Sequence, residues 1–194
     1  RPGESRPSKR AGHLVEDRST MNEIYILLPM VQFAISILLV SVVLLSAPGD
    51  RLNRLFTGFL IALGIWGISI FLMRDAFPDA DRAYTIEKIA LAAIPFTSIF
   101  FYHFVHTFTG AKRNKSVLIS FYGMGTIAAL LSLLGFTADG MVEKFYGFAP
   151  VITPFFGLIL LASYPPVALA IWDIRKALKN SHSRRANQLR LLRL

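Results

Sequence analysis

Five uncharged stretches of apolar residues alternate with polar segments along this chain. Each stretch is close to the roughly 20 residues that an α-helix needs to cross a bilayer. None contains Asp, Glu, Lys or Arg, so the 21 basic and 12 acidic residues are confined to the intervening segments and the two ends. This pattern predicts membrane-spanning helices over residues 24–46, 55–73, 89–108, 117–136 and 151–172.

The expected fold class is therefore all-α, a polytopic transmembrane helix bundle. Membrane β-strands are a weaker alternative, because they run about 10 residues and alternate between lipid-facing and lumen-facing side chains. Composition agrees with helices in lipid: 54% of residues are hydrophobic, 17% are charged, and the mean hydropathy is +0.51. The chain has no cysteine, which excludes disulfides and thiolate ligands from these residues.

Basic residues divide unequally between the two sides of the predicted bundle. Segments 47–54 and 109–116 and the tail after Trp172 share one side and carry twelve Lys and Arg, against four on the other side (Arg74, Arg82, Lys88 and Lys144). Because Lys and Arg resist export, we expect the tail in the cytoplasm and the N-terminus outside. We therefore attribute the net charge of +9 to the placement of basic residues on the cytoplasmic side of a bacterial inner membrane. The expected partner is the lipid bilayer and not nucleic acid.

Both ends of the chain raise questions. Residues 1–20 are polar and carry five basic side chains that would have to be exported. We interpret them as an over-extended reading frame, with translation starting at Met21, or as a disordered leader. The segment 184–194 predicts either the start of a sixth helix or a basic amphipathic tail on anionic lipid.

Scattered residues within this hydropathy pattern resemble the seven-transmembrane N-terminal region of bacterial histidine kinases. The residues that carry the resemblance are Asn53, Phe56, Trp66, Ile94-Pro95, Phe101-Tyr102-His103-Phe104, Phe108-Thr109-Gly110, Arg184-Arg185 and Gln188-Leu189-Arg190. The positions most like the family among these residues are Asn53, Trp66, Pro95, Arg185 and Gln188.

The resemblance implies a sensor domain over residues 21–194, incomplete at its C-terminus, in a two-component signal-transduction protein. Such a module receives a stimulus in or near the membrane and relays it to a cytoplasmic output domain in cis, such as a histidine kinase, within a homodimer of the full-length protein. The chain departs from the family pattern in lacking the sixth and seventh helices. It also has no phosphoacceptor histidine box and no Gly-rich nucleotide loop, so we expect no enzyme activity, no cofactor and no metal in these residues.

His103 and His106 are the ionisable residues inside a predicted span, and such residues are functional candidates by default. One turn apart on one helix, they could sense pH or form half of a metal site. The simpler interpretation is polar contact with a neighbouring helix near the interface. No acidic residue lies inside any predicted span.

Two further groups are candidate sites. Pro165 and Pro166, like Pro95 and Pro154, interrupt helical hydrogen bonding and could form a hinge, although membrane helices also tolerate proline without such a role. On the outer face, Phe145, Tyr146 and Phe148 could contact a ligand or form an interfacial aromatic belt. The small residues Gly58, Ala62, Gly64, Gly67, Gly123 and Gly125 predict close helix packing or dimerisation.

Two other functions remain open. A fragment of a multi-pass secondary transporter would use broken helices and charged groups at mid-membrane; the breaks are present, but the spans hold no Asp, Glu, Lys or Arg. A membrane-embedded enzyme needs positioned acids, bases or metal ligands, and the spans offer His103 and His106 alone.

Overall fold

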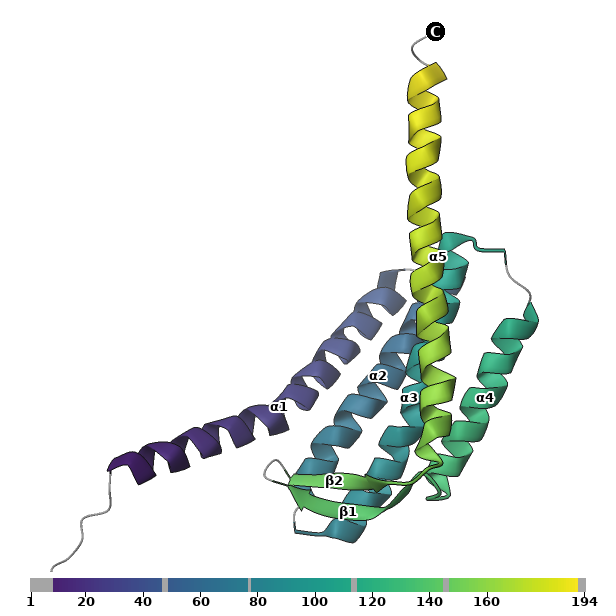
Figure 1. The fold of residues 1–194 in the computed structure, drawn as a ribbon. Coiled ribbons are helices and arrows are strands. Elements are labelled where there is room, and N and C mark those ends of the chain that lie inside the picture. Colours follow the sequence, from purple (N-terminus) through teal and green to yellow (C-terminus); the bar gives the residue numbers. More distant parts are fainter. Residues whose placement is uncertain (1–8, 47–48, 77, 113–114, 145–146, 192–194) are drawn as a thin grey trace, which may run out of the picture.

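In a computed structural model, the described part of the chain forms five helices and a two-stranded antiparallel sheet (Figure 1). It describes residues 9–46, 49–76, 78–112, 115–144 and 147–191, with side chains described from residue 27 to residue 179 of these ranges. The elements are α1 (Lys9–Ser46), α2 (Arg51–Asp75), α3 (Ala80–Thr109), α4 (Lys115–Leu133), β1 (Ala138–Lys144), β2 (Gly147–Ile152) and α5 (Phe156–Leu191).

All five helices are long and apolar enough to cross a membrane, which confirms the predicted helix bundle. The shortest, α4, has 19 residues and is about 28 Å long at 1.5 Å per residue, against a hydrocarbon core of about 30 Å. Large apolar side chains face outward: Leu28 is 65% exposed, Leu38 63% and Leu45 85%. Such an apolar outer surface suits hydrocarbon and not water.

Helix α3 is the centre of the bundle and packs against α2, α4 and α5, whereas α1 packs chiefly against α2. At one end of the bundle, which we call the hairpin end, strands β1 and β2 lie across the ends of α2 and α3 (Figure 1). At the opposite end, α5 continues well past the other helices (Figure 1). The direction of the helices alternates along the chain, as successive membrane crossings require.

Glycines bring neighbouring helices close together, as their positions predicted. A Cβ atom added at Gly67 of α2 would overlap the Gln32 side chain of α1, and one at Gly125 of α4 would overlap Ile99 of α3. Gln32 lies in this space and donates a hydrogen bond from Nε2 to the Leu63 carbonyl of α2 at 3.0 Å. These glycines therefore serve packing within the chain, while Gly123 meets no atom within 4 Å.

The segment expected as an outer loop is instead a β-hairpin, with Met141 paired to Pro150 and Glu143 to Phe148. Residues 151–152, predicted to open the fifth span, end β2, and α5 begins at Phe156. The apolar pair Val151-Ile152 extends the uncharged run, so hydropathy alone could not separate strand from helix.

The hairpin is fixed to the helices by both apolar and polar contacts. Phe148 is 5% exposed and packs against Met73, Ala76 and Ala83, which lie at this end of α2 and at the start of α3. Tyr84 of α3 donates a hydrogen bond from its hydroxyl to the carbonyl of Ala138 at 2.7 Å.

Helices α2 and α3 begin at capping residues and not where the uncharged runs begin. Asp79 accepts a hydrogen bond from the Arg82 amide at 2.9 Å, so α3 begins at Ala80 and not at residue 89. Asp50 accepts from the Leu52 amide at 2.9 Å, which starts α2 at Arg51 and not at residue 55. A carboxylate at the N-cap satisfies an amide that the helix leaves unpaired.

Prolines interrupt the helices less than predicted. Helix α3 is continuous through Pro95, and α5 is continuous through Pro165 and Pro166. Pro154 does not interrupt a helix, because it lies before the start of α5. The continuity of α5 agrees with the tolerance of membrane helices for proline, and the hinge role of the pair stays a prediction.

Residues 9–20, expected to belong to an over-extended reading frame or a disordered leader, lie in α1. They contain no proline, so no ring blocks helical hydrogen bonding there. Residues 1–8 lie outside the described residues, and the start of translation at Met21 stays a prediction.

Candidate functional site

His103 lies near the end of α3 and joins three helices. Its Nδ1 atom lies 3.0 Å from the Tyr122 hydroxyl of α4, and its Nε2 atom lies 3.4 Å from Nη2 of Arg51, at the start of α2. The Tyr122 ring also packs edge-on against the imidazole, with centroids 5.9 Å apart. The side chain thus bridges α2 and α4 from the central helix.

The contacts of His103 favour one tautomer. A guanidinium group can only donate hydrogen bonds, so Nε2 of His103 accepts from Arg51. In that arrangement Nδ1 carries the ring proton and donates a hydrogen bond to the Tyr122 oxygen. The two contacts therefore predict the tautomer with the proton on Nδ1.

His106 points toward a different helix. Its Nδ1 atom lies 3.5 Å from Oδ2 of Asp173 on α5, and the side chains of His106 and Asp173 are 20% and 2% exposed. The distance is within range for an ion pair, but the two atoms do not meet the geometry of a hydrogen bond. The pair carries opposite charges only when His106 is protonated, and a structure without hydrogens does not assign that proton.

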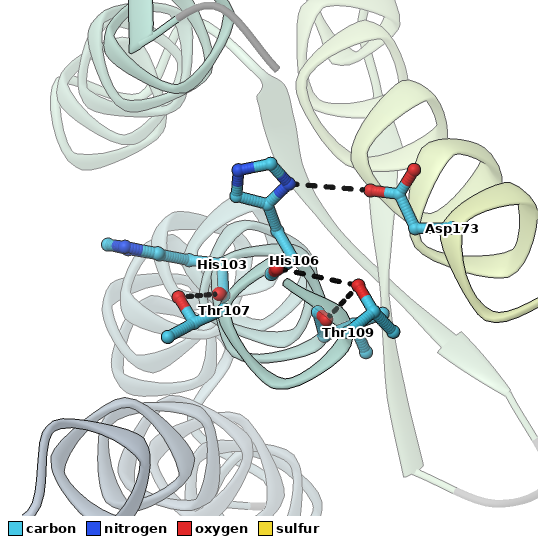
Figure 2. Close-up of polar contacts among 6 residues, drawn as sticks. His103, His106, Thr107, Thr109 and Asp173 are labelled. Atoms are coloured by element: carbon cyan, nitrogen blue, oxygen red, sulfur yellow. Dashed lines mark hydrogen bonds and ion pairs between the residues drawn. The ribbon is translucent and has the colours of Figure 1, made fainter. Parts of the chain in front are cut away.

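The two histidines do not converge on one site, although they are one turn apart. Figure 2 shows His106 extending from α3 toward Asp173 on α5, while the His103 ring lies on another side of α3. The hydroxyls of Thr107 and Thr109 bond back to the carbonyls of His103 and Val105 at 2.8 Å, which satisfies polar groups in the last turns of the helix. Together the two imidazoles link α3 to all three helices that pack against it.

Asp173 is a functional candidate that the sequence pattern missed. It follows directly after the predicted fifth span, and this helix continues to Leu191. A buried carboxylate therefore lies opposite His106, which corrects the expectation that the spans hold no acidic partner. The sequence does contain a signal for this pairing. Asp173 is the single acidic residue among the basic residues of 172–179. It lies at the same end of the bundle as His106 if the third and fifth spans cross the membrane in the same direction.

Glu87 is a second acidic residue that the pattern missed, because the predicted span began two residues after it. It lies within α3, is 3% exposed, and its Oε2 atom has no hydrogen-bond partner among the described residues. A buried carboxyl without a partner is costly and often functional. Glu87 lies in the half of α3 nearer the hairpin end, so the two acidic groups are at opposite ends of the bundle.

A recess of about 270 Å³ opens beside Asp173, between the end of α3 and the middle of α5. Thr109, Gly110, Ala111 and Lys112 line one side, and Trp172, Asp173, Lys176 and Ala177 line the other. A more open recess of about 490 Å³ shares Trp172 and Lys176 and adds Arg175 and Lys179.

The other predicted site residues are scattered. Asn53 lies in the first turns of α2, Trp66 is 37% exposed at the middle of that helix, and Pro95 is fully buried in α3. Phe148 is 5% exposed and packs against the ends of α2 and α3, and its role as an outer-face contact stays a prediction. Phe145 and Tyr146, and the side chains of Arg185 and Gln188, lie outside the described residues.

Within the described part of the chain, no group of three or more His, Asp or Glu side chains could hold a metal ion. Comparisons with known protein families, curated proteins and solved structures gave no match. The geometry of the site is therefore the basis for any functional conclusion.

Proposed function

We propose that this chain is the membrane-embedded, signal-receiving module of a bacterial signal-transduction protein of the inner membrane. In this proposal the hairpin end faces outward, and α5 leads toward a cytoplasmic output domain such as a histidine kinase. The output domain lies outside residues 1–194 and acts in cis, within a homodimer of the full-length protein.

The observation that carries the proposal is the contact between α3 and α5 at His106 and Asp173. Helix α5 runs for 36 residues without a break, from beside the hairpin to Leu191. The part of α5 from Phe156 to Lys179 is long and apolar enough to cross a membrane, and the helix continues past the other helices of the bundle (Figure 1). A shift of α3 at this pair would be carried along α5 in the direction of the tail.

Transport is the alternative. It is favoured by Glu87, because transporters use buried carboxyls to couple ion and substrate movement. It is opposed by the unbroken helices, since substrate sites in transporters are built at breaks, and α3 and α5 run through their prolines without one.

The coding sequence after Leu194 distinguishes the two functions. The proposal expects two more apolar helices and then a cytoplasmic domain with a phosphoacceptor histidine. Further bundles in inverted symmetry with this one would contradict the proposal and support transport.

Phosphotransfer in membranes that contain the full-length protein tests the role of the site. Asp173→Asn is expected to change the rate of autophosphorylation at least threefold, because it removes the charge that faces His106. Glu143→Gln, on the exposed side of β1, is the matched control and is expected to leave the rate unchanged. Equal rates in all three proteins would contradict a relay through this pair.

A further inference from the structure

A basic face surrounds Trp172 at the end of the bundle opposite the hairpin. Trp172, Arg175, Lys176 and Lys179 have the spacing i, i+3, i+4 and i+7, so they lie on one side of α5. Lys112, in the segment after α3, lines the adjoining recess together with Lys176. We call these five residues the basic face.

The basic face lies at the depth where hydrocarbon gives way to lipid headgroups. Before Asp173, α5 exposes apolar and aromatic side chains, with Ile171 45% exposed and Tyr164 68% exposed. After Asp173, the described residues include three cations within the next two turns. Trp172 is 64% exposed at this boundary. Tryptophan is enriched at membrane interfaces because its ring is apolar while its N–H group needs a polar partner.

The one acidic residue in the recess does not cancel these charges at the surface. The Asp173 side chain is 2% exposed and is directed toward His106. The four cations Lys112, Arg175, Lys176 and Lys179 therefore face outward around an exposed indole. The smaller recess has room for about nine water molecules at ~30 Å³ each, which is enough for a phosphate group and part of a glycerol.

We infer that the basic face binds the phosphate headgroup of an anionic phospholipid from the leaflet at this end of the bundle. The phosphate lies between Lys112 and Lys176, with Arg175 and Lys179 as further cations. The indole of Trp172 contacts the glycerol and the first carbons of the acyl chains. This site is independent of the signalling proposal, since it depends on the charges, the depth and the recess of the basic face and not on an output domain.

Trp172 is itself the probe for the test, because the chain contains two tryptophans and Trp66→Phe leaves Trp172 as the sole one. The full chain is placed in vesicles of phosphatidylcholine that contain brominated phosphatidylglycerol or brominated phosphatidylcholine. Quenching of Trp172 then reports which lipid occupies the site. We expect a preference for phosphatidylglycerol of about fivefold or more, since each nearby cation attracts anionic lipid by roughly that factor.

Lys112→Gln with Lys176→Gln is expected to lower this preference by about fivefold or more, while Arg175 and Lys179 keep any part that remains. The matched control, Arg54→Gln with Lys115→Gln, removes the same charge from the same end of the bundle but from residues that line neither recess. It is expected to keep the preference within twofold of the parent. Lys112→Arg with Lys176→Arg keeps the charge and is also expected to keep the preference.

Four results would overturn the inference. They are a parent preference near one, equal losses in the recess and control variants, loss in the charge-preserving pair, and relief of quenching by inorganic phosphate at constant ionic strength. The last result would assign the site to free phosphate and not to lipid. Far-UV circular dichroism verifies that each variant is folded, so a loss of preference is not read from an unfolded chain.

Discussion

The imidazole of His106 on α3 and the carboxylate of Asp173 on α5 lie 3.5 Å apart, with Asp173 almost fully enclosed. This contact joins the central helix to the helix that leaves the bundle. Its energetic value can be measured directly, because each side chain can be removed alone and together with the other.

A double-mutant cycle with His106→Ala and Asp173→Ala is expected to give a coupling energy of about 0.5–1.5 kcal/mol, the range for polar contacts between membrane helices. The measurement is the free energy of unfolding in mixed micelles, by titration with dodecyl sulfate. His106→Ala combined with Trp66→Phe is the control and should be additive within about 0.5 kcal/mol. Additivity of the His106 and Asp173 variants would contradict the coupling.

The tautomer of His103 is a second prediction. Because Arg51 can only donate, Nδ1 is expected to carry the proton, and nitrogen-15 chemical shifts of labelled histidine distinguish the two tautomers. Tyr122→Phe removes the acceptor for Nδ1–H and is expected to cost about 1 kcal/mol of unfolding free energy. A proton on Nε2 in the parent chain would show that the contact with Arg51 is wrong.

The contact between α1 and α2 depends on Gly67. Gly67→Ala is expected to lower the unfolding free energy by about 1 kcal/mol, because the new methyl group displaces the Gln32 amide and breaks its hydrogen bond to the Leu63 carbonyl. Gly123→Ala is the matched control, since that position is open and alanine favours helix by up to about 1 kcal/mol. Equal effects of the two substitutions would mean that Gln32 does not occupy this space.

The buried carboxyl of Glu87 provides the fourth prediction. Glu87→Met is expected to raise the unfolding free energy by about 1 kcal/mol, because it replaces a buried carboxyl, whose Oε2 atom has no hydrogen-bond partner among the described residues, with an apolar group of similar size. Glu143→Met, at an exposed strand position, should change it by less than about 0.5 kcal/mol. A loss in Glu87→Met above about 1 kcal/mol would show that the carboxyl makes a stabilising contact.

The sequence predicted the helices because charge is excluded from lipid, and this constraint can be read residue by residue. It did not predict the hairpin, since Phe148, Val151 and Ile152 are as apolar as a helix in the same place. It also missed Glu87 and Asp173, because both helices continue beyond their uncharged parts. The Asp79 cap starts α3 at Ala80, and α5 continues to Leu191. The pairing of His106 with Asp173 depends on how α3 and α5 pack, and no local pattern contains that information.

The unbroken course of α5 gives the helix a defined rotational phase. With 3.6 residues per turn, the 18 residues from Asp173 to Leu191 make about five full turns, so the backbone at residue 191 has nearly the same azimuth as Asp173. Deletion of one residue between them would turn everything that follows by about 100° relative to the bundle, and deletion of seven would restore the azimuth to within about 20°. The activity of any domain attached to this helix is therefore expected to vary periodically with the length of the segment after Lys179.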